Sequence, residues 1–535
     1  MIRWDLPSVG NREAGPRHRG SRPVRPRLSA GVIPYRTGPG GSCEIFWIRR
    51  SKSLRFMGGW NAFPGGRASP ADASVEVRGT MDGEQAFLDS GKLAAQPACA
   101  MRELFEEAGI LAAVGPVPDR SDLEAARMEL LAERLDFGKW LEDRGLAVDA
   151  SRLRFAGRWV TPPISPIRFD ATFFLLEWPL SEPSQPNVIP GELDCGGWIR
   201  PADALDRWLA GDVLLAQPTL ETLRVLAEHG PDGRYHLWLS ESHQPNSPRS
   251  IEFRPAVRAI PLQTRTLPPA THTNTLLLGD RDLVLIDPGA SDDESLRRLR
   301  EIVDKEARRG GGQLRGIWLS HHHIDHVAGA EAMRRRYSVP VSAHSATAAR
   351  LEGRGMRIDG RLKGGETVEL AGTPRLRVRI IHTPGHASGH LCFLEERSGT
   401  LLCGDMLSGW GTVVINPPDG SMDDYLRSLE RLEALGSRAA LPSHGSMFHD
   451  PAKALRDARR HRLWREDRVM AVWESGQRAP ASMLLPVYGD LDPVLRPIAA
   501  RQLLAHLERL ERTGRIDSLP DGILADIGRA EGPQL

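Results

Sequence analysis

The fold of the second half of this 535-residue chain is indicated by the stretch Ser320-His321-His322-His323-Ile324-Asp325-His326. It directly follows the apolar run Ile317-Trp318-Leu319, so the polar cluster is predicted to lie on a loop that leaves a buried strand. Binding and catalytic residues concentrate on such loops. Two imidazoles two residues apart, followed by an Asp-His pair, offer two sets of ligands for divalent metal ions such as Zn²⁺. The sequence therefore predicts a metal centre at this loop.

One segment cannot complete the coordination of two metal ions, and three further candidate ligands lie downstream. His386 ends the stretch His-Thr-Pro-Gly-His, Asp405 follows Leu-Leu-Cys-Gly, and His444 stands in Leu-Pro-Ser-His-Gly. Each follows a strand-like apolar run, which matches the context of the first cluster. We therefore predict a dinuclear centre. A hydrogen-bonded structural role is the expectation for the other nearby histidines, His322, His382 and His390.

The His-x-His-x-Asp-His motif, these later elements and the stretch Leu285–Gly289 together resemble the metallo-β-lactamase superfamily over roughly residues 260–451. The resemblance implies an αββα fold and two metal ions of Zn, Mn or Fe. The implied ligands are His321, His323 and His386 for one ion and Asp325, His326 and His444 for the other, with Asp405 bridging. Such a pair of ions activates water for hydrolysis. Asp325 is also the catalytic candidate that orients this water, and Asp287 is expected outside the ligand set.

The region after the last ligand adds a narrower resemblance. The segment 404–409, a short helix and a helical tail resemble the lactamase-beta-like protein 2 and glyoxalase II-like group, which implies a winged-helix-like tail. Cleavage of single-stranded RNA is ascribed to one member of that group. From Arg456 to Leu535, 13 arginines accompany 12 acidic residues, so the tail lacks the net positive charge of a phosphate-backbone binder. RNA is not the favoured substrate, and the tail is expected to pack against the hydrolase or complete its cleft.

The first half contains a helix with three clustered carboxylates. The stretch Arg102–Ile110 places Glu103, Glu106 and Glu107 at i, i+3 and i+4, which is one face of an α-helix. Three like charges on one face repel each other, whereas a hard cation such as Mg²⁺ requires clustered oxygen ligands beside a substrate diphosphate. The helix therefore predicts a second metal site, for a hard cation such as Mg²⁺.

This helix and Phe63-Pro64-Gly65-Gly66 resemble the Nudix box, and the resemblance covers roughly residues 27–228. It implies that Glu103, Glu106 and Glu107 bind Mg²⁺ or Mn²⁺, with Glu103 and Glu106 as the catalytic candidates. It departs from the compact box because about 35 residues separate Gly66 from Arg102, and the first Glu of the box has no counterpart where it is expected, at Ala94. Glu192 is a candidate extra ligand or base. The spacing of Arg50, Arg55, Gly65 and Gly66 resembles the coenzyme A signature of Nudix coenzyme A diphosphatases, which implies phosphate binding. The alternative is that the arginines solvate a strand-to-loop transition.

Length and composition predict several domains. One hydrophobic core rarely organises 535 residues. We expect a flexible tail at 1–28, a Nudix α/β/α sandwich at 29–230, a linker at 231–258, an αββα domain at 259–453 and a winged-helix-like domain at 454–535. A formal net charge of +1, short apolar runs and five scattered cysteines predict no membrane partner and a cytoplasmic location. Strands are expected near residues 30–34, 44–48, 171–177, 275–278, 283–286, 316–319, 376–381 and 401–403, and helices near 98–108, 292–306, 328–337 and 499–512.

The sequence thus predicts a multidomain α/β and α+β protein in which two metal-dependent hydrolases are fused. The leading hypothesis is degradation of a small acyl-coenzyme A type substrate, with thioester hydrolysis by the central domain and diphosphate cleavage by the first. Ester and phosphodiester hydrolysis stay open for the central domain. One alternative is a single-strand endoribonuclease. Another is a hydrolase regulated by a Nudix domain that binds a ligand without cleaving it. The oligomeric state is left open.

Overall fold

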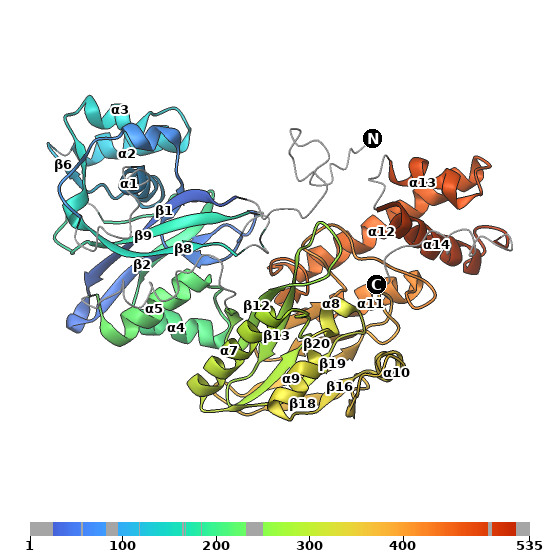
Figure 1. Ribbon diagram of the computed structural model, residues 1–535. Coiled ribbons are helices and arrows are strands. Elements are labelled where there is room, and N and C mark those ends of the chain that lie inside the picture. The colour runs from blue at the N-terminus through green and yellow to red at the C-terminus, as the bar shows by residue number, and fades with distance from the viewer. Residues whose placement is uncertain are drawn as a thin grey trace.

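The computed structural model describes residues 25–54, 57–81, 95–116, 118–162, 165, 167–182, 185–231, 250–489 and 495–519. Figure 1 shows an N-terminal domain drawn in blue to green, a central domain in yellow-green to orange, and a helical C-terminal region in orange to red. None of the described helices combines the length and the apolar character that crossing a membrane requires. The expected tail at residues 1–28 falls almost entirely outside the described residues.

The N-terminal domain is built around a sheet with the strand order β10-β2-β1-β9-β8. Strands β1 and β9 run parallel, and the other neighbours are antiparallel. The strands are β1 Arg27–Thr37, β2 Cys43–Arg50, β8 Leu153–Val160, β9 Phe169–Glu177 and β10 Leu193–Ile199, with the short strands β3 Asn61–Ala62 beside β2 and β4 Gly65–Arg67 beside β1.

Successive residues of these strands face two different helical layers. Val32 packs against helix α1 (Ala95–Ala108), whereas Ile33 packs in the cluster formed by helices α4 (Pro201–Ala210) and α5 (Gln217–His229). Side chains alternate across a strand with a period of two, so a sheet with apolar residues at consecutive positions must be covered on both faces. The domain is therefore the expected α/β/α sandwich.

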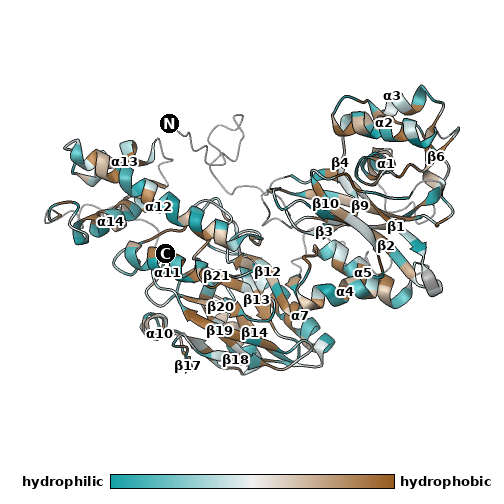
Figure 2. Ribbon diagram, turned by 180° about the vertical axis from the view of Figure 1, so that it is seen from behind, coloured by the Kyte–Doolittle hydropathy of each residue, from teal (hydrophilic) through white to brown (hydrophobic). Residues whose placement is uncertain are grey.

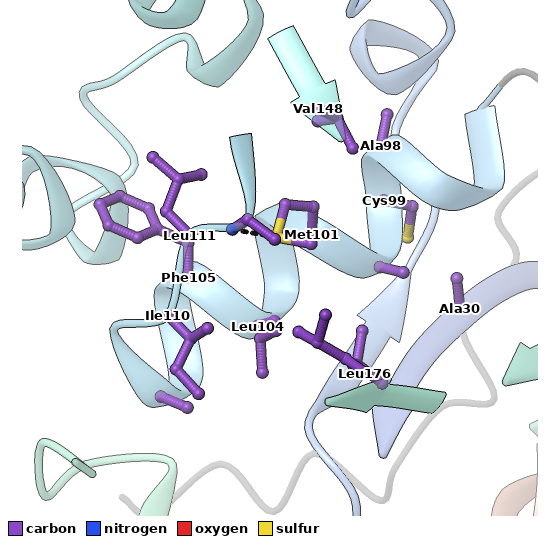
Figure 3. Close-up of a cluster of buried hydrophobic side chains, with 14 of the residues drawn as sticks. Ala30, Ala98, Cys99, Met101, Leu104, Phe105, Ile110, Leu111, Val148 and Leu176 are labelled. Atoms are coloured by element: carbon purple, nitrogen blue, oxygen red, sulfur yellow. Dashed lines mark hydrogen bonds between the residues drawn. The ribbon is translucent and has the colours of Figure 1, made fainter. Parts of the chain in front are cut away.

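Helix α1 packs through an apolar stripe, and a small sheet covers part of it. Met101, Leu104 and Phe105 are buried in the core, as Figure 3 shows, and the Met101 sulfur accepts a hydrogen bond from the Ala112 backbone N–H at 3.2 Å. Phe105 stacks on Trp140 with ring centroids 5.7 Å apart. The elements around it are β5 Val77–Arg78, β6 Ala113–Val114, β7 Ala147–Asp149, α2 Arg120–Leu131, α3 Phe137–Glu142 and the 3₁₀ turns Pro70–Ser74 and Ala150–Arg152. A third 3₁₀ turn, Pro39–Gly41, connects β1 to β2.

The central domain contains two sheets packed face to face. Their orders are β11-β12-β13-β14-β15-β16-β17 and β18-β19-β20-β21-β22. The first comprises β11 Ile251–Arg254, β12 Val257–Gln263, β13 His272–Leu278, β14 Asp282–Ile286, β15 Gln313–Leu319, β16 Val341–Ala343 and β17 Gly360–Arg361. The second comprises β18 Thr367–Leu370, β19 Leu376–His382, β20 Leu391–Glu395, β21 Thr400–Gly404 and β22 Ala439–Pro442. Figure 2 shows hydrophobic residues concentrated on these strands.

Three apolar clusters account for the four layers of this domain. One fills the space between the sheets, a second lies under the helices beside the first sheet, and a third lies under the helices beside the second sheet. The helices are α7 Asp293–Gly310, α8 Ile324–Val327, α9 Ala330–Tyr337, α10 Ser345–Glu352 and α11 Met422–Glu433. The αββα prediction is confirmed, and the helix expected at 328–337 corresponds to α9, with the short helix α8 just before it.

The C-terminal region is helical, as expected, but two predicted boundaries are wrong. Helix α12 (Pro451–Glu474) is continuous across the boundary predicted at 453/454 and is followed by α13 (Pro480–Tyr488) and α14 (Arg496–Arg512). The predicted linker 231–258 is wrong at its end, since β11 and the start of β12 belong to the first central sheet. Two charged residues of β11, Glu252 and Arg254, are buried and make ion pairs and hydrogen bonds with other parts of the chain.

The N-terminal and central domains share a buried contact. Trp60 from the loop after β2 lies in the apolar cluster between the two central sheets, where its ring meets Phe253 edge-on at 6.4 Å. The Arg254 guanidinium donates to the backbone carbonyls of Gly211 and Val213 at 3.2 and 3.0 Å. The two domains are therefore held together by packing as well as by the chain.

Candidate metal centre

Three imidazoles converge at the edge of the central sheets. His321 and His323 follow β15, and His386 follows β19. The Nε2 atoms of His321 and His386 both lie 2.9 Å from Nδ1 of His323. Burial, followed by the neighbouring imidazoles, holds the pKa of His321 and His323 well below the usual range. The rings are thus neutral, and their ligand atoms lie within 4.8 Å of one another, which suits a metal ion.

A second ligand group lies beside the first. Ligand atoms of Asp325, His326 and His444 lie within 4.8 Å of one another. The Asp405 carboxylate lies between the groups, with Oδ2 at 3.5 Å from Nε2 of both His386 and His444. The predicted residues are therefore together, and Asp405 stands where a bridging ligand would.

Unpartnered atoms test whether a metal ion fits. Nε2 of His326 and Oδ1 of Asp405 are buried and have no hydrogen-bond partner among the described residues. Burial alone would lower the pKa of His326, but the carboxylates of Asp325 and Asp405 raise it well above its usual value. Buried polar atoms are seldom left unpaired. Unpartnered atoms beside carboxylates and imidazoles are suited to coordinate cations, so the donor set fits two divalent ions.

Hydrogen bonds on the outer side of each ring determine which nitrogen faces the centre. Nδ1 of His386 donates to the Val414 carbonyl at 2.6 Å, and Nδ1 of His444 donates to the His272 carbonyl at 3.1 Å. Nδ1 of His326 lies 2.9 Å from Asp287. When such a ring is neutral, the proton on Nδ1 leaves the lone pair of Nε2 available to coordinate a metal ion.

Asp287 supports the centre from outside it. Its Oδ1 accepts from the Ser320 backbone N–H at 2.7 Å, and its Oδ2 accepts from the Ser320 hydroxyl at 2.5 Å and from His326. Asp287 also falls in a possible ligand triplet with His321 and His326, but both of its oxygens are already occupied by donors. A Cβ on neighbouring Gly289 would lie 1.8 Å from the Asp325 carbonyl oxygen, so only glycine fits there.

The three nearby histidines that were predicted to lie outside the ligand set, His322, His382 and His390, contact other side chains. His390 lies 2.8 Å from the Thr383 hydroxyl through Nδ1, and its Nε2 accepts from the Asp405 backbone N–H at 3.1 Å. Burial lowers the pKa of His390 to about 3, which keeps the ring neutral and able to accept. His382 stacks on His344, and His322 lies 3.7 Å from Asp419. The expectation that these histidines lie outside the ligand set agrees with these contacts.

A cleft of about 1140 Å³ opens onto the metal ligands. Its walls include the loop 265–270, the end of α10, the loop 410–419 and residues of the C-terminal helices. Tyr488, Ile498, Arg501 and Gln502 belong to that C-terminal contribution, which agrees with the prediction that the tail completes the cleft. Arg265, Arg350 and Arg354 also line the cleft, and Arg350 pairs with Asp419 at 2.6 Å.

The N-terminal domain gathers a separate carboxylate cluster. Gly65 N–H donates to Oε2 of Glu107 at 2.8 Å, and a Cβ on Gly66 would lie 2.4 Å from the Glu103 carboxylate. Burial raises the pKa of Glu103 to about 7 and that of Glu107 to about 8, and burial also raises the pKa of Glu106. Carboxyls that resist ionisation when they are crowded together are suited to a cation, which would remove the repulsion.

Other predicted residues of this half lie around the same cluster. Arg50 is close enough to Glu107 to lower its pKa, and Glu192 is close enough to Glu106 to raise its pKa. The predicted phosphate-binding residue Arg55 lies outside the described residues. The structure therefore brings Arg50, Gly65, Gly66 and Glu192 to the three glutamates, but it leaves the coenzyme A prediction untested.

Asp72 is the functional candidate that the sequence interpretation missed. Its carboxylate accepts from Arg102 at 2.8 and 3.0 Å, and Arg102 in turn contacts Glu103 at 2.8 Å. Asp72 is almost fully buried, in the turn Pro70–Ser74. The position expected for an acidic partner, counted back from Arg102, is Ala94, whereas Asp72 lies shortly after Gly66. The insertion separates Asp72 from the helix in sequence only.

Comparison with known proteins agrees with the central and C-terminal domains. Residues 268–444 match the model of the metallo-beta-lactamase superfamily, and residues 480–523 match that of the beta-lactamase associated winged helix domain. A beta-lactamase-like protein 2 homolog of Drosophila melanogaster is 27% identical over 46% of this chain and 84% of its own length. An atrochrysone carboxyl ACP thioesterase of Aspergillus fumigatus is 25% identical over 38% of this chain and 61% of its own length.

The solved structures similar to part of this chain include a Nudix protein. A NUDIX hydrolase from Alicyclobacillus acidocaldarius has 31% sequence identity and a TM-score of 0.35, with 40% of this chain and 96% of that chain covered. A TM-score this low does not by itself establish a shared fold. The matched family models and the αββα architecture show that residues 268–444 form a domain of the metallo-β-lactamase fold and that a winged-helix domain follows it at residues 480–523.

Proposed function

We propose that the central domain hydrolyses an acyl thioester whose carrier is anionic, as in a coenzyme A derivative. The observation that carries this proposal is the convergence of seven imidazole and carboxylate ligands, with unpartnered Nε2 and Oδ1 atoms, at the bottom of a cleft. Two divalent ions bound there would polarise a carbonyl and lower the pKa of a water molecule toward neutrality. Zinc is the preferred metal, because the donors are imidazoles and carboxylates.

The residues of the centre would have two roles, metal coordination and orientation of the attacking water. His321, His323 and His386 would hold one ion, Asp325, His326 and His444 the other, and Asp405 both. Oδ2 of Asp325 lies 3.5 Å from Nε2 of His444 and accepts a hydrogen bond from the Thr273 hydroxyl at 3.3 Å. That contact holds its carboxylate in a fixed orientation, from which it would orient the attacking water and receive its proton.

The arginines that line the cleft support an anionic substrate. Apart from the metal ligands, four arginines and one aspartate are the charged residues that line it, and the aspartate is paired with Arg350. Arg265 and Arg354 are exposed and carry charge that no acidic residue of the lining balances. Guanidinium groups bind phosphate with paired hydrogen bonds. The thioesterase among the relatives is consistent with a thioester as the bond that is cleaved.

The test compares two thioesters with the same acyl group. Hydrolysis of an acyl-coenzyme A and of the matching acyl-N-acetylcysteamine would be measured for the zinc-loaded chain and for Arg354→Gln, with Arg335→Gln on an exposed helix face as the control. Arg354→Gln is expected to lower kcat/KM about tenfold on the charged substrate alone. Equal loss on both substrates would remove the anionic carrier from the proposal. Intact thioesters with the metal bound would remove thioester hydrolysis, and a panel that includes single-stranded RNA would then test the ribonuclease alternative.

A second activity, hydrolysis of a diphosphate by the N-terminal domain, is favoured by one observation. The acidic residue that the Nudix resemblance seemed to lack has a counterpart in Asp72, which holds Arg102 against Glu103. Glu103, Glu106 and Glu107 would hold Mg²⁺ or Mn²⁺ beside the diphosphate, and Arg50 would contact a phosphate. Such a domain would cleave the coenzyme A that the central domain releases.

Glu106→Gln separates a catalytic domain from a ligand-binding one. Release of the adenylate half of coenzyme A would be measured with Mg²⁺, and Glu124→Gln on an exposed helix provides the control. Loss of turnover in Glu106→Gln alone supports diphosphate hydrolysis. Coenzyme A binding without turnover in the wild-type chain would instead support the non-catalytic, regulatory alternative.

A further inference from the structure

The backbone segment Val413–Ile415 lies between a metal ligand and the C-terminal helices. The Val414 carbonyl accepts the hydrogen bond from Nδ1 of His386 at 2.6 Å. The next residue, Ile415, donates its backbone N–H to Oε1 of Gln502 on α14 at 2.9 Å. The preceding Val413 carbonyl accepts from the Arg462 guanidinium on α12. The carbonyl that orients His386 is therefore flanked on both sides by bonds to the C-terminal region.

Both side chains that hold this segment are buried. Gln502 is 7% exposed and Arg462 is 4% exposed, so neither makes its bond in competition with bulk water. Arg462 also stacks on Tyr425 at 5.3 Å, and the Tyr425 hydroxyl donates to the Met406 carbonyl at 2.9 Å. Met406 follows Asp405 directly, so the same arginine supports the backbone beside the bridging candidate. Two ligand-bearing segments are thus connected to helix α12.

We infer that Gln502 and Arg462 are positioning residues of the metal centre, and that the C-terminal region is a structural part of that centre. The Nδ1 hydrogen bond sets the direction in which Nε2 of His386 points, so a shift of the Val414 carbonyl turns the ring. The side chain of Val414 is apolar and makes no hydrogen bond that could fix the position of the Val414 carbonyl. The two flanking bonds, from helices 49 and 87 residues further along the chain, hold it instead.

This inference rests on the proposed metal centre and is tested by metal content rather than by activity. Gln502→Leu keeps the size of the side chain and removes the acceptor for Ile415, and Arg462→Met removes the donor to Val413. Metal affinity would be measured by competition of the full-length variants with a chromophoric zinc chelator, together with elemental analysis. We expect the affinity for one of two zinc ions to fall about 10- to 100-fold, because loss of an outer hydrogen bond has effects of that size. The ion held by Asp325, His326 and His444 should remain.

Two further variants separate positioning from general packing. His506→Leu alters a fully buried residue one turn beyond Gln502 that contacts Glu466 and not the segment 413–415, so it should retain both ions. Gln502→Glu keeps an acceptor oxygen and should also retain both. The melting temperature of each metal-free variant would show whether it folds.

Wild-type affinity in both Gln502→Leu and Arg462→Met would overturn the inference, and so would an equal loss in His506→Leu. A wild-type chain that binds no zinc would instead overturn the metal centre on which the inference depends. Should Gln502→Leu not fold, the Arg462→Met variant carries the same test through the other flanking bond.

Discussion

Replacing Asp287 by asparagine should weaken the metal centre without touching a ligand. Asp287 is 2% exposed and lies at a φ of 51°, a conformation that asparagine adopts readily, so the backbone is not strained by the change. The carboxylate accepts from the Ser320 N–H, from the Ser320 hydroxyl and from Nδ1 of His326. An asparagine oxygen can retain the first of these bonds, whereas its NH₂ group then faces the other two donors.

The magnitude follows from the tautomer of His326. With Asp287 present, the proton stays on Nδ1 and Nε2 is free to coordinate. In the Asp287→Asn variant, a donor faces Nδ1, and the favourable tautomer places the proton on Nε2 instead. Metal binding at Nε2 then returns the proton to Nδ1 of His326, where it faces the NH₂ group of the asparagine. Two buried donors without an acceptor cost about 1–3 kcal/mol. Because about 1.4 kcal/mol is a factor of ten, zinc affinity should fall about 10- to 100-fold.

Competition with a chelator measures this loss, and thermal unfolding of the metal-free proteins shows whether the variant is folded. Asp292→Asn is the matched control, since Asp292 is exposed and caps helix α7 through the Ser295 N–H, a bond that asparagine also makes. Wild-type affinity in Asp287→Asn would refute the reasoning, and an equal loss in Asp292→Asn would show that the effect is not specific to His326.

Three further outcomes are expected. Gly66→Ala should abolish Mg²⁺ binding by the N-terminal domain, because its Cβ would lie 2.4 Å from the Glu103 carboxylate, whereas Gly197→Ala, with open space around it, should bind Mg²⁺ normally in calorimetric titrations. The metal-free chain should become less stable to denaturant as the pH rises from about 4.5 to 8, because burial raises the folded-state pKa of Glu103 to about 7 and that of Glu107 to about 8. The stability that these groups contribute is fully present below their unfolded-state pKa and is lost as the pH rises through the folded-state values. Mg²⁺ should restore the stability at about pH 9, and a free energy of unfolding that does not change with pH would contradict the burial argument. Trp60→Ala should cost about 3–5 kcal/mol and split thermal unfolding into separate transitions of the two domains, which calorimetry would detect; a single unchanged transition would count against the buried contact.

Much of the fold could be predicted from local patterns. The strands after which His321, Asp405 and His444 stand are short apolar runs, and each lies where it was expected. Helix α1 was recognised by its apolar stripe and its carboxylates on one face. The linker expected at 231–258 is wrong at its end because residues 251–254 form a strand, in which Glu252 and Arg254 are buried against partners from the N-terminal domain and from the sheet. Sequence pattern alone cannot tell a paired buried charge from an exposed one.

Which side chains are available as ligands can be predicted from the sequence, because the spacing of imidazoles and carboxylates in loops after strands already limits what they can bind. Which partner each of these side chains has depends on the tertiary structure. Asp72 pairs with Arg102 across a long insertion, and Gln502 reaches Ile415 from 87 residues away. Such contacts leave no periodic signal in the sequence, because they depend on how the helices pack and not on the spacing of residues along one element.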